Sequence, residues 1–223
     1  MPFASLGLDA SILKAVADQG YTEPTPIQKA AIPAVIEGID VIGIAQTGTG
    51  KTAAFTLPLL TRLLRTANNT HKGRVRCLIL APTRELVVQI AENVAAYSRY
   101  SGAVVATCYG GVSERPQIAA LRRGCDFLVA TPGRLLDLGS QGHGDFSAVE
   151  CLVLDEADRM LDMGFLPAIN TIVRALPPER QTLMFSATLS REIETLTKQY
   201  QRSPKLIEVG RRANPAETVT QLL

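Results

Sequence analysis

Short, continuously apolar runs alternate along the chain with longer stretches whose apolar residues recur at helical spacing. An apolar run without polar alternation is typical of a strand that is covered on both faces. We predict such strands at residues 40–45, 75–81, 103–108, 126–130, 151–155 and 181–186. Helical spacing predicts helices at residues 9–19, 26–37, 51–64, 83–100, 115–123, 133–137, 166–175 and 191–200.

This regular exchange of strand and helix predicts an α/β fold with a mostly parallel sheet and helices on both faces. In such folds ligands bind where the strands end, at their carboxyl edge. We therefore expect the functional motifs to follow the strands directly.

Composition changes this picture little. The 223 residues are 46% hydrophobic and 20% charged, which suits one sizeable globular domain. A net charge of only +2 does not indicate a nucleic-acid binder, so such a site would depend on local clusters of arginine and lysine. No apolar run is long enough for a membrane span, and the first residues lack the pattern of a signal peptide. We expect a cytoplasmic protein without a membrane segment.

The sequence spacing of the four cysteines and two histidines does not match a metal-binding motif. We expect Cys77, Cys108, Cys125 and Cys151 to be buried, reduced thiols, because each lies in or beside an apolar run. Residues 66–73 and 139–145 are polar and predict surface loops, and the histidines lie in these loops as exposed side chains without a catalytic role.

A glycine-rich segment at residues 45–52 gives the strongest local signal. It joins a predicted strand to a predicted helix, and its glycines allow consecutive backbone amides to face a phosphate. Lys51 can reach the β and γ phosphates of a nucleotide, and Thr52 can ligate Mg²⁺. The general phosphate-loop pattern has glycine where this chain has Ala45. The alternative is a glycine-rich turn that happens to precede a lysine.

An acidic cluster follows the strand predicted at residues 151–155. Asp155 would hold Mg²⁺ through water, and Glu156 would orient and deprotonate the attacking water. Adjacent carboxylates repel one another, and a bound cation removes that cost. The alternative is a helix N-terminus that carries acids because its dipole favours them.

Residues 155–158 read Asp-Glu-Ala-Asp, and the chain resembles the DEAD-box helicases, within them the bacterial RhlE-like group. The resemblance covers essentially the whole chain. Its motifs occur in the family's order at residues 20–28, 45–52, 82–86, 110–111, 131–134, 155–158 and 186–188. Alanine at position 45 is usual in this family.

The resemblance implies a RecA-like P-loop domain at residues 1–209, including an N-terminal Q-motif extension. Residues 210–223 would begin the linker to a second RecA-like domain that this sequence lacks. It implies ATP and Mg²⁺ as cofactors, with Lys51, Asp155 and Glu156 as the catalytic residues and Thr52 and Asp155 at the metal. The implied nucleotide-binding residues are Phe3, Tyr21, Gln28, Thr47, Gly48, Thr49, Gly50, Lys51 and Thr52.

Two further roles follow from the resemblance. Gln28 would pair with the adenine edge while Tyr21 or Phe3 stacks on the ring, which selects ATP over GTP. Asp158 would link to Ser186 and Thr188 and couple the nucleotide site to the rest of the protein. A plain helix cap is the alternative for the Ser-Ala-Thr turn.

Three motifs resemble the family's RNA contacts. The implied RNA-binding residues are Pro82, Thr83, Arg84, Gly110, Gly111, Thr131, Pro132, Gly133 and Arg134, with Arg115 in support. Glycine backbone, hydroxyls and arginines suit phosphates and 2′-hydroxyls, so RNA binding would not depend on base sequence. No aromatic platform is evident along these loops. The alternative for each arginine is a solvated charge or an internal salt bridge, above all for Arg84 beside Glu85.

The implied activity is RNA-dependent ATP hydrolysis with local duplex unwinding in the full-length protein, which we expect to be a monomer. The chain alone would bind nucleotide and hydrolyse it slowly or not at all. The alternatives are an ATP-gated RNA clamp and a P-loop ATPase that acts on DNA or protein.

Overall fold

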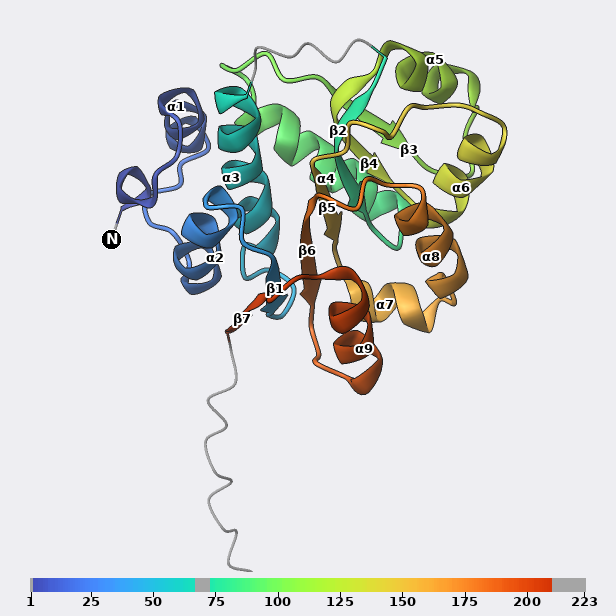
Figure 1. Ribbon diagram of the computed structural model, residues 1–223. Helices are drawn as coiled ribbons and strands as arrows, with labels where there is room; N and C mark the ends of the chain where they lie inside the picture. The colour runs from blue at the N-terminus through green and yellow to red at the C-terminus, as the bar shows by residue number, and fades with distance from the viewer. Residues whose placement is uncertain (1, 67–72, 210–223) are drawn as a thin grey trace, which may run out of the picture.

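Seven parallel strands form one sheet in the computed structural model of the chain, which describes residues 2–66 and 73–209 (Figure 1). The strand order is β3-β4-β2-β5-β6-β1-β7, and every pairing between these strands is parallel. The strands are β1 Val41–Ile44, β2 Val75–Leu80, β3 Val105–Cys108, β4 Cys125–Ala130, β5 Cys151–Leu154, β6 Gln181–Ser186 and β7 Lys205–Glu208. The predicted α/β class is confirmed.

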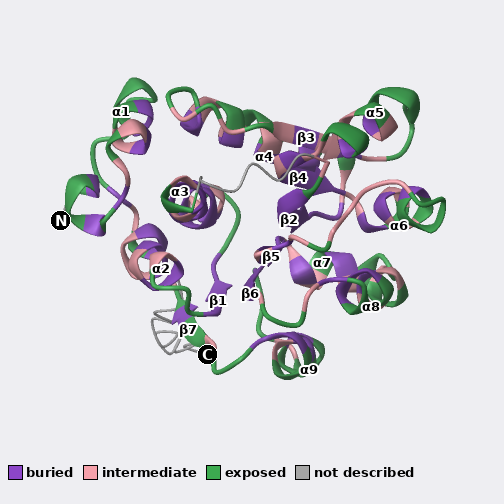
Figure 2. Cartoon of the chain, turned by 45° about the horizontal axis from the view of Figure 1, so that its top comes forward, coloured by how far each residue is buried: buried purple, intermediate pink, exposed green. Residues whose placement is uncertain are grey.

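Helices cover both faces of this sheet (Figure 2). On one face lie η1 Phe3–Leu6, α1 Ala10–Asp18, α2 Pro26–Ile36, α3 Lys51–Arg65 and α4 Arg84–Tyr97. On the other lie α5 Arg115–Arg123, α6 Pro132–Ser140, α7 Ala157–Asp162, α8 Leu166–Arg174 and α9 Arg191–Tyr200. Within residues 2–66 and 73–209, none of these helices combines the length and the apolar character that crossing a bilayer requires.

Side chains of the inner strands alternate between two apolar layers. In β2, Cys77 and Ile79 pack into the layer of α1–α4, whereas Leu78 and Leu80 pack into the layer of α5–α9. Strands that are buried on both sides in this way have no solvent-facing side, which explains their mostly apolar sequences.

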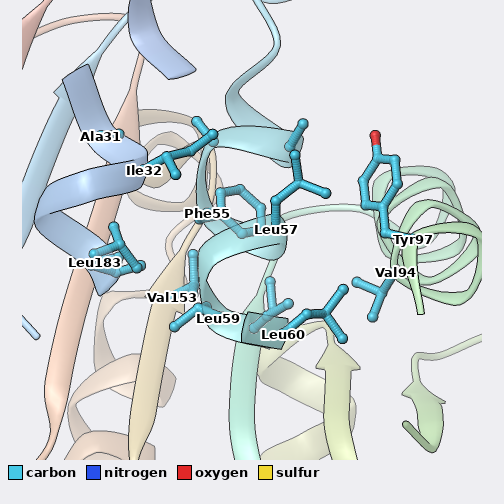
Figure 3. Close-up of a cluster of buried hydrophobic side chains, with 14 of the residues drawn as sticks. Ala31, Ile32, Phe55, Leu57, Leu59, Leu60, Val94, Tyr97, Val153 and Leu183 are labelled. Atoms are coloured by element: carbon cyan, nitrogen blue, oxygen red, sulfur yellow. The ribbon is translucent and has the colours of Figure 1, made fainter. Parts of the chain in front are cut away.

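Helix α3 is the centre of the first layer. Phe55, Leu57, Leu59 and Leu60 lie among side chains of α2, α4 and the strands (Figure 3). The Phe55 ring lies 5.2 Å from that of Phe185 in β6. Truncating a core phenylalanine to alanine costs about 3–5 kcal/mol, so α3 is held firmly and the loop before it has a rigid base.

The cysteines are buried, as predicted, and unpaired. Burial raises the pKa of Cys108 and of Cys125 to about 12, which keeps both thiols protonated at neutral pH. They act as small apolar side chains in the strands.

Three elements were not predicted. The 3-10 helix η1 and the six-residue α7 are too short for a recognisable period, and β7 is an edge strand in which only Ile207 is buried. Helix α6 extends to Ser140, so the predicted loop at 139–145 starts later than expected. Residues 67–72, with His71, and the predicted linker at 210–223 lie outside the described residues.

Candidate active site

All the predicted strand-end motifs lie at the carboxyl edge of the sheet, and the strand order divides them into two halves. The adjacent strands β5, β6 and β1 lead into the acidic cluster, the Ser-Ala-Thr turn and the phosphate loop. The adjacent strands β3, β4 and β2 lead into the three motifs assigned to RNA. The motifs predicted to bind nucleotide and those predicted to bind RNA thus lie side by side along one edge.

The phosphate loop connects β1 to α3 with two glycines in the left-handed region. Gly48 has φ 83° and Gly50 has φ 90°, values that side chains other than glycine rarely adopt. A Cβ on Gly50 would also lie only 2.4 Å from Nε2 of Gln28. Thr49 braces the loop by donating its hydroxyl to the Gln46 carbonyl at 2.8 Å. Glycine at position 50 is therefore required by both backbone conformation and space.

Lys51 is the first residue of α3 and is buried, with 7% of its surface exposed. Its ammonium donates a hydrogen bond to the Ala45 carbonyl at 2.9 Å, across the base of the loop. Next to it, Thr52 is half-buried and Thr47 is exposed in the loop. The loop places a positive charge and the N-terminus of α3 together, an arrangement that attracts phosphate.

Asp155 lies directly after β5 and is almost fully buried. Burial raises the pKa of its carboxyl group to about 6, and the nearby positive charge of Lys51 opposes this shift. Strands β1 and β5 both pair with β6, so Lys51 after β1 and Asp155 after β5 lie at the same edge of the sheet, as the phosphate-loop interpretation requires. Asp155 also accepts a hydrogen bond from the backbone amide of Glu156 at 3.0 Å.

Glu156 has an unusual backbone. Its φ of 52° and ψ of 51° place it in the left-handed region, at the N-cap position of α7. For a residue with a Cβ this conformation costs about 1–2 kcal/mol, and such strain concentrates at functional sites. Its carboxylate pairs with Arg159 at 3.2 Å. This arginine was not predicted, although its (i, i+3) spacing from Glu156 indicates such a pair.

Asp158, in the first turn of α7, holds the turn that follows β6. Its Oδ2 accepts hydrogen bonds from the amide of Ala187 at 3.1 Å, the amide of Thr188 at 3.2 Å and the Thr188 hydroxyl at 3.2 Å. Ser186 is not bonded to Asp158 directly; its hydroxyl accepts from the Thr188 amide at 3.3 Å. The prediction for Ser186 is thus corrected to an indirect role.

The alternative that the Ser-Ala-Thr turn caps the next helix is wrong. Helix α9 begins at Arg191, and its cap is Ser190, whose hydroxyl accepts from the Ile193 amide at 3.4 Å. The acidic cluster at residues 155–158 had a second interpretation, a helix N-terminus that carries acids. That interpretation is partly right, since Asp158 does lie in the first turn of a helix.

Gln28 connects the Q motif to the phosphate loop. Its Oε1 accepts from the Thr25 amide at 2.9 Å, and its Nε2 donates to the Gly50 carbonyl at 3.1 Å. The side chain is buried at 4% exposure. A carboxamide has a second N–H and a second lone pair, so these two bonds leave one donor and one acceptor position unused.

The two candidate stacking rings differ in exposure. Phe3 is buried in the core, whereas Tyr21 is 40% exposed, and their rings stack with centroids 6.4 Å apart. The Tyr21 hydroxyl lies 3.1 Å from that of Tyr97. Phe3 therefore supports Tyr21 from within, and Tyr21 has the more accessible ring.

Arg84 begins α4 and lies over an aromatic ring that the sequence analysis did not identify. Its guanidinium carbon is 5.3 Å from the ring centroid of Tyr109, the residue before Gly110. Within the described ranges Arg84 forms no ion pair, so the predicted internal pairing with Glu85 is not found. The loops do contain an aromatic ring, but Arg84 covers one face of it.

Arg134 connects two of the RNA-assigned loops. Its Nη1 donates to the Val112 carbonyl at 3.4 Å, and its Nε lies 3.9 Å from the Asp137 carboxylate. The internal salt bridge considered for this arginine is thus present, although long. The neighbouring strands are joined where Thr131 donates its amide to the Cys108 carbonyl at 2.9 Å.

Two residues shape the loops around these arginines. Thr83 caps α4 by accepting from the Leu86 amide at 3.3 Å. Gln117, which the sequence analysis missed, bonds the Tyr109 amide at 3.0 Å and the Tyr109 and Ser113 carbonyls at 3.1 Å each. Of the other residues assigned to RNA, Gly110, Gly111 and Gly133 are exposed, and so is the supporting Arg115, whereas Pro82 and Pro132 are buried.

The described residues contain no cluster of three or more histidine, cysteine or acidic side chains that could enclose a metal. Mg²⁺ at a phosphate site takes only one or two protein oxygens and completes its shell with water and phosphate. Asp155, whose buried carboxylate forms no ion pair within residues 2–66 and 73–209, and Thr52 fit that limited role.

Comparison with known proteins gives one consistent family. Residues 25–196 match the model of the DEAD/DEAH box helicase family. The chain is 46% identical over 224 residues to a protein named ATP-dependent RNA helicase RhlB from Pseudomonas putida, covering 98% of this chain and 56% of that protein. It is 48% identical over 209 residues to DEAD-box ATP-dependent RNA helicase 30 of Arabidopsis thaliana, covering 93% of this chain and 35% of the relative.

A solved structure agrees with these relatives. The crystal structure of a DEAD box protein from the hyperthermophile Methanococcus jannaschii superposes with a TM-score of 0.88 at 37% identity, covering 96% of this chain and 57% of that one. The chain thus spans about half the length of this structure and of the Pseudomonas protein, and about a third of the plant protein. The name RhlB, and not RhlE, recurs among the bacterial relatives, so the predicted RhlE-like group gains no support.

Proposed function

Because the chain belongs to the DEAD/DEAH box helicase family, we propose that it is the ATP-binding domain of an RNA-dependent ATPase that separates short RNA duplexes. The single observation that carries this proposal is the position of Lys51 and Asp155 at the carboxyl edge of the parallel sheet, after the two strands that flank β6 and beside the Asp158–Thr188 contact. Relatives named ATP-dependent RNA helicases support ATP and RNA as the ligands. Their names favour an RhlB-like protein over an RhlE-like one.

The phosphate loop would bind the nucleotide through its backbone amides and through Lys51. The Lys51 ammonium, now bonded to the Ala45 carbonyl, lies at the base of the loop and can turn toward the β and γ phosphates. Thr47, Gly48, Thr49 and Gly50 would complete the cradle. Gln28 would read adenine with its remaining donor and acceptor, and Tyr21 would stack on the base.

Thr52 and Asp155 would hold Mg²⁺, which when bound neutralises the charge that develops on the phosphate oxygens. Glu156 would accept the proton of the attacking water. Its ion pair with Arg159 engages only Oε2, which leaves Oε1 to accept that proton. Asp158 would transmit the state of the acidic cluster to the turn after β6.

The other half of the edge would bind RNA. Arg84, Arg134 and the amides around Gly110 and Gly111 offer donors to phosphates and 2′-hydroxyls. None of these groups is arranged to read base edges, which supports binding without sequence preference.

A second RecA-like domain would complete both sites. The family's relatives extend well beyond the length of this chain, and in ATPases of this type the transition-state charge is stabilised by arginines from outside the phosphate loop. We therefore expect the chain alone to bind nucleotide and to turn it over slowly. Four buried, unpaired cysteines support a reducing, cytoplasmic setting.

Substitution of Glu156, the proposed general base, tests the proposal in the full-length protein. Glu156→Gln keeps the size of the side chain and removes its basicity, so ATP affinity should stay within about twofold while RNA-stimulated phosphate release falls by about 10²-fold or more. Glu37→Gln, an exposed change at the end of α2, is the matched control.

Three outcomes would contradict parts of this proposal. Full turnover by Glu156→Gln would remove Glu156 from the base role. ATP-dependent RNA retention without duplex separation would indicate a clamp instead of a helicase. Equal stimulation of the ATPase by DNA and RNA would overturn the assignment of RNA.

A further inference from the structure

A cavity lies at the amino edge of the sheet, opposite the carboxyl edge that carries the candidate active site. Its volume is about 940 Å³, and its lining includes Asp40 before β1, Arg76 in β2, Glu150 before β5 and Gln181 at the start of β6. The strands between this cavity and the phosphate loop have four to six residues, a separation of about 13–20 Å. The cavity is therefore independent of the nucleotide and RNA sites.

Four arginines line this cavity, and only two of them have carboxylate partners. Arg76 pairs with Glu150 at 2.8 Å, and Arg202 pairs with Glu179 at 2.8 Å. Neither Arg62 nor Arg180 forms an ion pair with any carboxylate in residues 2–66 and 73–209. The cavity therefore holds positive charge in excess of its ion pairs.

The remaining acid of the lining does not neutralise these two arginines by contact. Asp40 is buried, and its carboxylate accepts from the amide of Thr182 at 2.8 Å and the amide of Arg202 at 2.7 Å. These bonds fix the carboxylate to the backbone between β6 and β7.

Arg180 carries a donor without an acceptor. Its Nη1 donates to the Pro177 carbonyl at 2.8 Å, but its buried Nε has no hydrogen-bond partner among the described residues. Burial also lowers the pKa of this guanidinium, and the negative charge of Asp40 opposes this shift. An oxyanion in the cavity would satisfy the donor and neutralise the charge.

Arg62 is held in place by neutral groups. Its guanidinium donates to the side-chain oxygen of Gln181 and lies against Gly38, where an added Cβ would be 3.7 Å from it. Gln181 is itself anchored to the carbonyls of Val35 at 3.2 Å and Ile39 at 2.6 Å. These contacts hold the Arg62 guanidinium in place without pairing its positive charge with a carboxylate.

We propose that this cavity binds the phosphate or diphosphate group of a small phosphorylated molecule, with Arg62 and Arg180 as its ligands. Paired guanidinium groups match the geometry of phosphate oxygens, and the volume falls in the range of small-molecule sites. An RNA strand fits less well, because only Arg62 and Arg180 lack carboxylate partners in this lining, which suits one phosphate or diphosphate group and not an extended backbone of many phosphates.

The test uses the full chain carrying Lys51→Ala, which disables the phosphate loop, with inorganic pyrophosphate as the probe. Amide chemical shifts in NMR titrations should change at Gly38, Asp40 and Gln181. Arg180→Gln in the same background should weaken pyrophosphate binding by about tenfold, as expected for loss of a charge-assisted bidentate contact. Arg174→Gln, an exposed change on α8 outside the cavity, should leave it unchanged.

Further titrations distinguish which kind of phosphorylated molecule the cavity binds. ADP and ribose 5-phosphate, titrated against pyrophosphate, identify which phosphorylated class binds best. Should Arg180→Gln unfold the chain, Arg180→Lys keeps the charge, loses the planar fork and should still weaken binding. Unchanged pyrophosphate affinity in a folded Arg180 variant, or shifts confined to the phosphate loop, would overturn the proposal. Displacement of pyrophosphate by an RNA oligonucleotide without terminal phosphate would instead assign the cavity to RNA.

Discussion

Asp158 holds Thr188 through two hydrogen bonds, one from the backbone amide and one from the side-chain hydroxyl, each 3.2 Å long. One carboxylate oxygen thus joins the helix after β5 to the turn after β6. Because Asp155 lies three residues earlier on the same segment, a change at the nucleotide site has a short path to that turn.

Asp158→Asn should weaken this connection. The amide oxygen of asparagine is neutral and accepts hydrogen bonds more weakly than the charged carboxylate oxygen, so the free energy of unfolding should fall by about 1–2 kcal/mol, allowing for partial exposure. Urea denaturation measures this change. In the full-length protein, RNA stimulation of ATP hydrolysis should fall more than ATP affinity does. Asp162→Asn, an exposed change on the same helix, is the control, and an equal loss in both variants would contradict the special role of Asp158.

The pH dependence of stability should reveal Asp155. Its pKa rises from 3.8 to about 6 on folding, so the folded chain binds this proton more tightly than the unfolded chain. The free energy of unfolding should therefore fall as pH rises from about 4 to about 6, with a full penalty of about 3 kcal/mol above that window. Below about pH 4 both states are protonated and the penalty is absent.

Asp155→Asn isolates this contribution. The difference in unfolding free energy between the parent and the variant should change between about pH 4 and pH 6 and be flat outside that range. Asparagine leaves Lys51 without its neighbouring carboxylate, which reduces the gain of the variant at neutral pH but not the pH dependence. Urea denaturation across this range gives the curve, and a constant difference would show that the carboxyl titrates normally.

The sequence was sufficient for the features that depend on local pattern. Gly50 and Lys51 stand in a fixed spacing after an apolar strand, and in a parallel sheet that alone places them at the carboxyl edge. The same logic placed Asp155 correctly, because the end of a buried strand determines where the next residue lies.

Contacts between distant segments could not be predicted in this way. Arg84 lies over Tyr109 because the loops after β2 and β3 come close on either side of β4, and the strand order is not written in any local pattern. Ser186 was assigned to Asp158 through the resemblance, but which atoms of the turn face the carboxylate depends on its backbone. The edge strand β7 escaped detection because only Ile207 is buried in it.

Gln28 should influence both stability and nucleotide choice. Gln28→Glu keeps an oxygen for the Thr25 amide but loses the donor to the Gly50 carbonyl, and Gln28→Ala loses both bonds. We expect the free energy of unfolding to fall by about 1 kcal/mol for each lost bond. The preference for ATP over GTP, measured by competition binding, should be lost in both variants. Retained preference in Gln28→Ala would show that other groups read the base.

Arg134 provides the sharpest test of the RNA half, because its internal bonds are long and leave its charge only partly neutralised. Its distances of 3.4 Å to the Val112 carbonyl and 3.9 Å to Asp137 are at or beyond ordinary hydrogen-bond length. Arg134→Ala should therefore weaken single-stranded RNA binding by about fivefold and lower the slope of log affinity against log salt by about 0.7–1, with ATP affinity unchanged. Arg123→Ala removes the same charge from the far end of α5 and should change neither quantity. Fluorescence anisotropy across a salt series separates the possibilities: a lost affinity with an unchanged slope would mean that Arg134 shapes the loops after β3 and β4 without contacting phosphate.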